Sequence, residues 1–186
     1  GSTGLKHGWT MLHPEKWNGK SLPGADSAHV FSYTELLERQ PKLGEQVLIF
    51  DNMGGRQGAV VAEILARQDK IEQFVTQLGQ ASPDLATSRD WGKVHGMLKN
   101  LGVKFHVDCE LLSIDNDQVV MRDLYTGKKS SFKNISAVVM VQGGAANDQL
   151  YHSLCDSNPC HLIGDAMAQR RVNDAINDGE LVARQI

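Results

Sequence analysis

A continuous apolar segment that leads directly into a glycine-rich turn constrains this chain more than any other feature. Residues 47–50 read Val-Leu-Ile-Phe, and three glycines follow within the next turn: Gly54, Gly55 and Gly58. All-apolar strands are typical of parallel sheets that are covered on both faces. We expect a helix over about 58–67 and a second strand over 71–76. The pattern therefore predicts a βαβ unit with a parallel sheet.

The rest of the chain continues the alternation of helices and strands. The expected helices are 33–39, which Ser32 can cap, 88–101 and 170–186. The expected strands are 104–109, a β-meander over 111–132, 137–141 and a short strand ending at Leu162-Ile163. We expect the apolar face of the last helix to be buried. These elements predict an α/β, Rossmann-like FAD/NAD(P)-binding domain with a central parallel sheet, helices and a small antiparallel β-meander.

The glycine turn matches a dinucleotide-binding fingerprint only in part. If Gly58 packs the helix on the strand, Gly55 is the residue that pyrophosphate approaches, and Met53 stands where the turn glycine belongs. The following strand ends in Thr76 and Gln77, where an NAD site needs an acidic residue for the ribose. NAD(P)H binding at Gly54, Gly55 and Gly58 is therefore doubtful. The alternatives are a turn kept for packing, or a methyl-donor site that uses Asp51.

A second strand-turn-helix corner is expected near the C-terminus, at Gly164-Asp165. Glycine lets a ligand approach the backbone, and the carboxylate of Asp165 can accept hydrogen bonds from ribityl or ribose hydroxyls. Arg171 and its neighbour Arg170 could face a pyrophosphate. Alternatively, Asp165 caps the helix and the arginines are exposed.

Charge and cysteine content exclude several classes of function. The net charge is −3 and the basic residues are scattered, so we predict no nucleic-acid partner. The apolar runs are too short to span a membrane, and no leader peptide is evident. Cys109, Cys155 and Cys160 lack the spacing of a redox pair or a metal-ligand set, so we predict no metal site in this chain. A reducing, cytoplasmic location is expected.

Residues 163–172, Ile-Gly-Asp-Ala-Met-Ala-Gln-Arg-Arg-Val, resemble the FAD-binding Gly-Asp motif of the pyridine-nucleotide–disulfide-oxidoreductase-like module. The chain is similar in particular to the C-terminal region of the NADH:flavin oxidoreductase, trimethylamine dehydrogenase and 2,4-dienoyl-CoA reductase family. Three further segments carry the resemblance: 22–26, 139–143 and 147–152. The segment 139–143 ends at Gly143, where relatives have a Thr-Gly-like turn.

The resemblance implies how the chain is organised. Residues 1–27 would be a linker, 28–150 an NAD(P)-binding-like Rossmann domain, and 151–186 the returning strand and helix of an FAD- or ADP-binding domain. FMN and a 4Fe-4S cluster would belong only to the full-length protein, whose TIM barrel this chain lacks.

The incomplete fingerprint resembles the amine-dehydrogenase branch more than the reductase branch. The resemblance thus predicts a catalytically inert part of a flavin-dependent amine dehydrogenase or N-demethylase. A working NADH:flavin reductase domain and a non-catalytic nucleotide-binding or scaffolding module are the alternatives. We expect no catalytic residue in this chain; its partners would be the rest of its own polypeptide, an electron-transfer protein and, in a homo-oligomer, a second copy.

Overall fold

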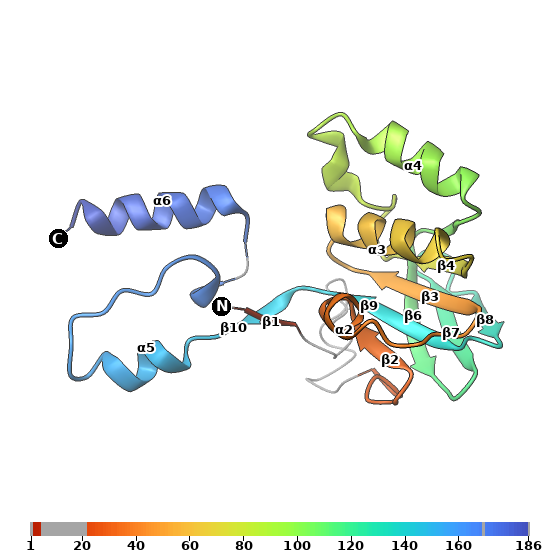
Figure 1. Cartoon of the computed structure of the whole chain (residues 1–186), viewed down its shortest axis with the longest axis horizontal. Coiled ribbons are helices and arrows are strands. Elements are labelled where there is room, and N and C mark those ends of the chain that lie inside the picture. The colour runs from red at the N-terminus through yellow and green to blue at the C-terminus, as the bar shows by residue number, and fades with distance from the viewer. Residues whose placement is uncertain (1, 5–21, 169, 186) are drawn as a thin grey trace. The chain divides into compact units, whose positions relative to one another are not determined.

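A computed structural model describes residues 2–4, 22–168 and 170–185 of the chain (Figure 1). The described residues divide into two units. The central unit comprises residues 22–142. The terminal unit comprises residues 2–4 together with 143–168 and 170–185, so the central unit is inserted into the sequence of the terminal unit.

A five-stranded parallel sheet forms the middle layer of the central unit, with strand order β2-β9-β3-β4-β5. The strands are β2 (Val30–Ser32), β3 (Gln46–Asp51), β4 (Ile71–Val75), β5 (Lys104–His106) and β9 (Ala137–Val141). Every residue of β9 is buried, as are the last five of β3. Full burial explains why these two strands have no polar–apolar alternation in the sequence.

Helices cover one face of this sheet: α2 (Tyr33–Arg39), α3 (Arg56–Ala66) and α4 (Trp91–Asn100). Ser32 and Glu35 form a capping box at the start of α2, which explains why this short helix begins there. Val61 and Leu65 of α3 pack with Val47 and Ile49 of β3 in one apolar cluster. Leu98 of α4 joins the same cluster.

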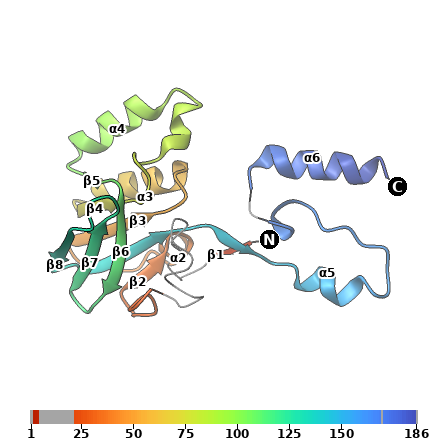
Figure 2. The same ribbon diagram turned by 180° about the vertical axis from the view of Figure 1, so that it is seen from behind.

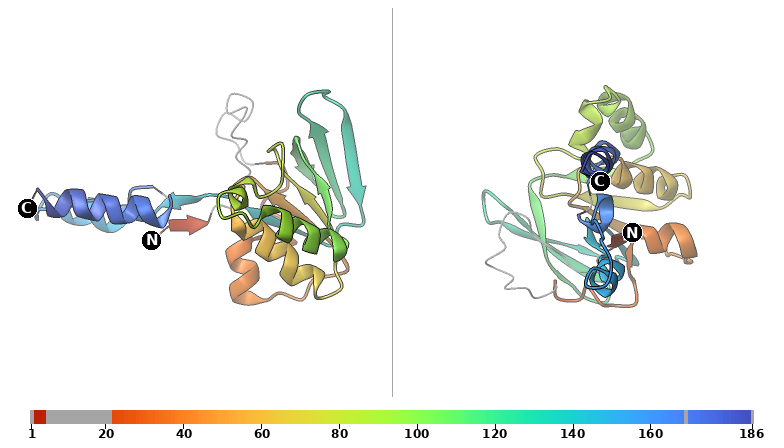
Figure 3. Two further views of the ribbon diagram at one scale, coloured as in Figure 1. Left: turned by 90° about the horizontal axis from the view of Figure 1, so that it is seen from above. Right: turned by 90° about the vertical axis from the view of Figure 1, so that its left-hand side faces the viewer.

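An antiparallel sheet covers the opposite face. Its strands are β6 (Cys109–Ile114), β7 (Gln118–Asp123) and β8 (Lys129–Lys133), in that order. Leu48 and Phe50, which point to this side of β3, pack with Leu111 and Val119 in a second cluster. Figures 2 and 3 show the three layers, with the parallel sheet between the helices and the antiparallel sheet.

The terminal unit is small and thinly packed. It contains the antiparallel pair β1 (Ser2–Gly4) and β10 (Gly144–Ala146), the helices α5 (Gln149–Leu154) and α6 (Val172–Ala183), and the 3₁₀ turn η2 (Gly164–Ala166). None of α5, α6 and η2 contains a buried residue. Val172 is 72% exposed and Ile176 is 65% exposed on α6.

The predicted α/β class, with its parallel sheet and β-meander, is confirmed. Three details of the prediction are wrong. Leu162-Ile163 is not a strand, and the predicted strand 104–109 ends at His106 because Asp108 adopts a positive φ and turns the chain into β6. The last helix, expected to bury its apolar face, buries none of its residues; the strands described in the terminal unit are only the three-residue pair β1 and β10, which is too small to cover it.

Candidate functional site

The first candidate site lies where β3 ends and α3 begins. The parallel sheet changes its winding direction between β3 and β9, and ligands of open α/β sheets bind outside the carboxyl ends of the strands at such a point. The two strand ends are joined here, since the Asn52 N–H donates to the Val141 carbonyl over 3.0 Å. The predicted residues Gly54, Gly55 and Gly58 all lie at this corner, with Gly55 as the residue before α3.

A buried carboxylate occupies the inside of the corner. Asp51, the last residue of β3, is fully buried. Its Oδ1 accepts hydrogen bonds from the backbone N–H of Met53 over 2.9 Å and of Gly54 over 3.1 Å. Its Oδ2 is buried and has no hydrogen-bond partner. Burial raises the pKa of Asp51 to about 6, against the lowering effect of the two N–H donors and with a further raising effect from the Asp84 carboxylate.

Gly58 lies directly against this carboxylate. A Cβ on Gly58 would be 2.5 Å from Asp51 Oδ2 and 3.1 Å from the Phe74 ring. Gly58 therefore packs α3 on the sheet, as the fingerprint interpretation expects of its third glycine. Gly54 has a φ of +69°, and its Cα faces the side chains of Leu78 and Pro83.

The segment from residue 77 to residue 90, which we call the covering loop, closes over Gly54. The Asp84 N–H donates to the Gly54 carbonyl over 3.0 Å, and Arg56 pairs with Asp90 at 2.8 Å. The hydrogen bond from Arg56 lowers the pKa of Asp90, with a further lowering from Ser88. These contacts hold the middle of the covering loop against the glycine turn and its last residue against the start of α3.

Two aromatic side chains anchor the covering loop on its far side. The Trp91 indole N–H donates to the Ala81 carbonyl over 3.0 Å, and His95 Nε2 lies 2.8 Å from the same oxygen. The rings of Trp91 and His95 stack at 4.1 Å, and His95 stacks on Phe105 at 4.8 Å. Ala81 and Leu85 are buried, so the covering loop is an integral part of the core.

These observations test whether the corner fits a dinucleotide. A pyrophosphate needs free backbone N–H groups and room beside the glycines. The N–H groups of Met53 and Gly54 are engaged by Asp51, and side chains fill the space beside Gly54. Thr76 and Gln77, which follow β4, are buried and present no carboxylate for a ribose. The protein itself therefore fills the corner at Gly54, and the corner lacks the acidic residue that the ribose of NAD needs.

The second candidate site is the Gly164-Asp165 turn of the terminal unit. Gly164 has a φ of +59°, and its N–H donates to Asp178 Oδ2 over 3.0 Å. Asp165 is exposed, and its Oδ1 accepts only a long hydrogen bond, 3.4 Å, from the Arg170 N–H. An exposed carboxylate beside a left-handed glycine fits the hydroxyl groups of a ribose or ribityl chain.

The two arginines near this turn have different surroundings. Arg170 forms an ion pair with Asp178, so one carboxylate joins both Gly164 and Arg170 to α6. Arg171 is exposed at the start of α6, where its backbone N–H donates to Asp174 over 3.1 Å. Sequence reasoning missed Asp178; its spacing from Gly164 gives no local pattern. Gly143, the remaining predicted site residue, is exposed between β9 and β10.

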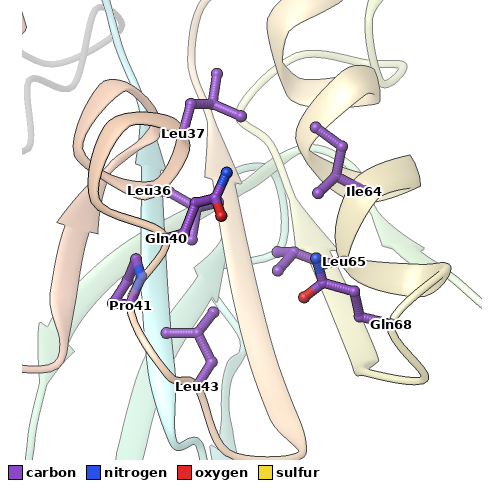
Figure 4. Close-up of a pocket in the computed structure, with 8 residues that line it drawn as sticks. All are labelled: Leu36, Leu37, Gln40, Pro41, Leu43, Ile64, Leu65 and Gln68. Carbon is purple, nitrogen blue, oxygen red and sulfur yellow. The ribbon is translucent and has the colours of Figure 1, made fainter.

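Each unit also has a groove. In the terminal unit, a groove of about 400 Å³ lies beside the Gly164-Asp165 turn, with Tyr151, Cys160 and Ala166 among its lining residues. In the central unit, a groove of about 360 Å³ separates α2 from α3 (Figure 4). Its apolar lining includes Leu36 and Leu37 from α2 and Ile64 and Leu65 from α3. Gln40 and Gln68 line the second groove too and are its polar side chains.

Within residues 2–4, 22–168 and 170–185, no three His, Cys, Asp or Glu side chains lie close enough together to hold a metal ion. The helices of this described part are also too short or too polar to cross a membrane.

Comparisons with known proteins agree with the fold. No protein-family model matches the chain, and no curated protein matches its sequence. Among solved structures, 6-hydroxypseudooxynicotine amine oxidase from Pseudomonas geniculata N1 matches 88% of this chain and 25% of its own, at 26% identity and a TM-score of 0.81. Histamine dehydrogenase from Rhizobium sp. 4-9 matches 100% and 29%, at 24% identity and a TM-score of 0.88.

A 2-naphthoyl-CoA reductase is a further structural neighbour, with 89% of this chain and 24% of its own covered, 23% identity and a TM-score of 0.74. All three neighbours are oxidoreductases, and this chain spans less than a third of each. The fold is therefore that of one part of larger oxidoreductases.

Proposed function

We propose that this chain is the nucleotide-binding-type part of a larger flavin-dependent oxidoreductase that acts on amines, and that it has no turnover by itself. The observation that carries the proposal is the order of the two units in the sequence. β1 and β10 pair with each other, the complete central unit is inserted between them, and the chain ends in the Gly164-Asp165 turn and α6. Within the described residues, the strands of the terminal unit are the short pair β1 and β10, of three residues each.

The amine oxidase and histamine dehydrogenase neighbours support this choice of enzyme class. They match this chain over 88% and 100% of its residues. In this proposal, residues 28–150 correspond to the NAD(P)-type domain and 151–186 to an FAD- or ADP-binding domain, with 1–27 as the linking segment; β1 and β10, near the two borders, pair within the terminal unit. Gly164, Asp165 and Arg171 would hold the ribose and phosphate groups of FAD or ADP, with Gly143 at the crossing between domains.

The chain's own residues also favour the amine branch over a working NADH-dependent reductase. The covering loop fills the space at Gly54, and the Asp51 carboxylate lies against Gly58, two of the three glycines that NADH would need. FMN and a 4Fe-4S cluster, which would carry the redox chemistry, are assigned to the part of the polypeptide outside this chain. The protein is proposed to work in the cytoplasm and to pass electrons to a protein acceptor.

The size of the natural polypeptide tests the proposal. An antibody raised against the purified chain should detect, in cells that encode it, a polypeptide about three to four times as long as this chain, as in the two amine-oxidising neighbours. A band at the 20.4 kDa of the chain alone would contradict the proposal.

Ligand titration of the purified 186-residue chain separates the amine and reductase classes. We expect calorimetry to detect no binding of NADH or NADPH at millimolar ligand. Micromolar NADH binding would favour the reductase alternative. Reduction of a dye with histamine, trimethylamine or NADH by this chain would contradict its assignment as an inert part.

A further inference from the structure

We propose that Asp51 determines ligand specificity in the central unit: its carboxylate supplies, from within the chain, the negative charge that a dinucleotide pyrophosphate would bring to the β3–α3 corner. The inference rests on the proposed function only in treating the central unit as a nucleotide-binding type. The β3–α3 corner is still an anion site, and the anion that occupies it is the carboxylate of Asp51.

The hydrogen bonds of Asp51 support this interpretation. Anions at a strand-to-helix corner are held by backbone N–H groups of the glycine turn. Asp51 Oδ1 accepts from two such groups, those of Met53 and Gly54, at 2.9 and 3.1 Å. Two of the N–H donors that the turn could offer to a phosphate oxygen are thus engaged by a carboxylate oxygen.

The second carboxylate oxygen lies at the first turn of α3. A Cβ on Gly58, the third residue of the helix, would be only 2.5 Å from Asp51 Oδ2. The first turn of α3 contains no acidic residue, and Gly55 provides no side-chain cap. The positive end of the helix dipole therefore has Asp51, from the preceding strand, as a carboxylate beneath it.

Packing alone does not account for an acidic residue here. Asp51 is fully buried, and Oδ2 lacks any hydrogen-bond partner. Burying a carboxylate with an unsatisfied oxygen is costly. What Asp51 supplies in return is an acceptor for the Met53 and Gly54 N–H groups, which an apolar residue would leave without this partner. The N–H groups of Gly54 and Met53 lower the pKa of Asp51, against the larger raising effect of burial. These donors favour an anion, which is the property that a pyrophosphate site requires.

The same carboxylate excludes external anions. A phosphate group that approached Gly54 or Gly58 would meet the negative charge of Asp51 and, from the covering loop, that of Asp84, whose N–H donates to the Gly54 carbonyl. Arg56 does not offset this repulsion fully, because it pairs with Asp90. Removing the Asp51 carboxylate should therefore free two N–H donors and a space large enough for a phosphate oxygen.

The test uses Asp51→Ala with inorganic pyrophosphate as the probe, because pyrophosphate is small enough to avoid most of the covering loop. We expect calorimetry at pH 8 to give at least about tenfold tighter pyrophosphate binding for the variant than for the unaltered chain. We also expect pyrophosphate to raise the melting temperature of the variant and not that of the unaltered chain, since a ligand stabilises the state that binds it.

Asp123→Ala is the matched control. Asp123 Oδ1 also accepts backbone N–H groups, from Tyr125 and Thr126 at 3.1 and 2.7 Å, but in an exposed turn of the antiparallel sheet. This variant should bind pyrophosphate no better than the unaltered chain. A similar gain in both variants would show a general effect of lost negative charge and would overturn the proposal.

Asp51→Asn covers the case in which the alanine variant does not fold. Asparagine keeps an oxygen acceptor for Met53 and Gly54 while removing the charge, so pyrophosphate binding should tighten about threefold or more. Unchanged pyrophosphate affinity in whichever of the two variants melts cooperatively would overturn the proposal. The polypeptide-size test does not depend on Asp51, so failure of this inference is distinguishable from failure of the proposed function.

Discussion

The β3–α3 corner and the Gly164-Asp165 turn both combine glycine with aspartate, and their surroundings are opposite. The β3–α3 corner has a buried carboxylate, a glycine in contact with it and a loop that covers it. At the Gly164-Asp165 turn, the carboxylate is exposed and the adjoining helix buries nothing. A glycine and an aspartate thus specify the backbone conformation of a turn, whereas the layers packed around the turn decide whether a ligand can enter.

The largest expected difference between the two regions is in hydrogen exchange. Amides of β3 and β9, which lie in the fully buried middle of the parallel sheet, should exchange at least about a hundredfold more slowly than amides of α6 in the purified monomer. The physical reason is that α6 opens without exposing buried apolar surface. Exchange mass spectrometry at pH 7 measures this ratio.

The concentration dependence of the same experiment tests the predicted homo-oligomer. If a second copy covers Val172 and Ile176, protection of α6 should rise with protein concentration while protection of β3 stays constant. A monomer in which α6 is as protected as β3 would contradict the contrast between the units.

Equal substitutions in two helices sharpen the contrast. Gly58→Ala should lower the free energy of unfolding by about 1–3 kcal/mol, because the new methyl group would overlap Asp51 Oδ2 at 2.5 Å. Gly179→Ala in α6 meets no atom within 4 Å and should be neutral or should stabilise its helix by up to about 1 kcal/mol. Urea denaturation followed by circular dichroism measures both. Equal losses in the two variants would show that α6 is as tightly packed as α3.

A smaller effect is expected from Glu72, a buried residue of β4 whose two carboxylate oxygens have no hydrogen-bond partner. Burial raises its pKa from 4.5 to about 8. The folded protein holds this proton more tightly than the unfolded chain does. The contribution of Glu72 to the free energy of unfolding is therefore greatest below pH 4.5 and is lost as the pH rises through about 8. Glu72→Gln should remove this slope and stabilise the chain by about 1–2 kcal/mol at pH 9.

The measurement for Glu72→Gln is the free energy of unfolding between pH 6.5 and 9. This range lies above the value of about 6 to which the pKa of Asp51 is raised, so Asp51 contributes little to the slope. Glu38→Gln on the exposed side of α2 is the control and should change stability by less than about 0.5 kcal/mol at any pH in the range. An unchanged slope in Glu72→Gln would indicate that water reaches this carboxylate.

Sequence patterns were sufficient where a local rule and the tertiary environment agree. Ser32 and Glu35 specify the start of α2, and the apolar residues 137–141 form β9 with the predicted bounds. They were insufficient for α4, which begins at Trp91 rather than at Ser88, because Arg89 has a φ of +60° that a right-handed helix does not allow. The helix α5 was missed because it has only six residues, so that Leu150 and Leu154 alone do not establish a helical repeat.

The candidate residues show the same division. The spacing of Gly54, Gly55 and Gly58 indicated an incomplete fingerprint, and Gly58 does pack against the sheet. The sequence connects Asp51 only with an alternative methyl-donor site. Its burial against the glycine turn depends on tertiary contacts that the local pattern does not indicate. The assignment of Gly143, Gly164, Asp165 and Arg171 to a cofactor stays a prediction.

Local sequence patterns are enough to predict the parallel sheet, the glycine turn after β3 and the Gly164-Asp165 turn. Apolar runs and glycines set the backbone conformation within a few residues of themselves. Only the tertiary structure decided that the first corner is filled and the second is open. A buried charge, a covering loop and an uncovered helix face each depend on residues far apart in the chain, such as Gly54 with Pro83 or Gly164 with Asp178. The periodicity of neighbouring residues does not predict those contacts.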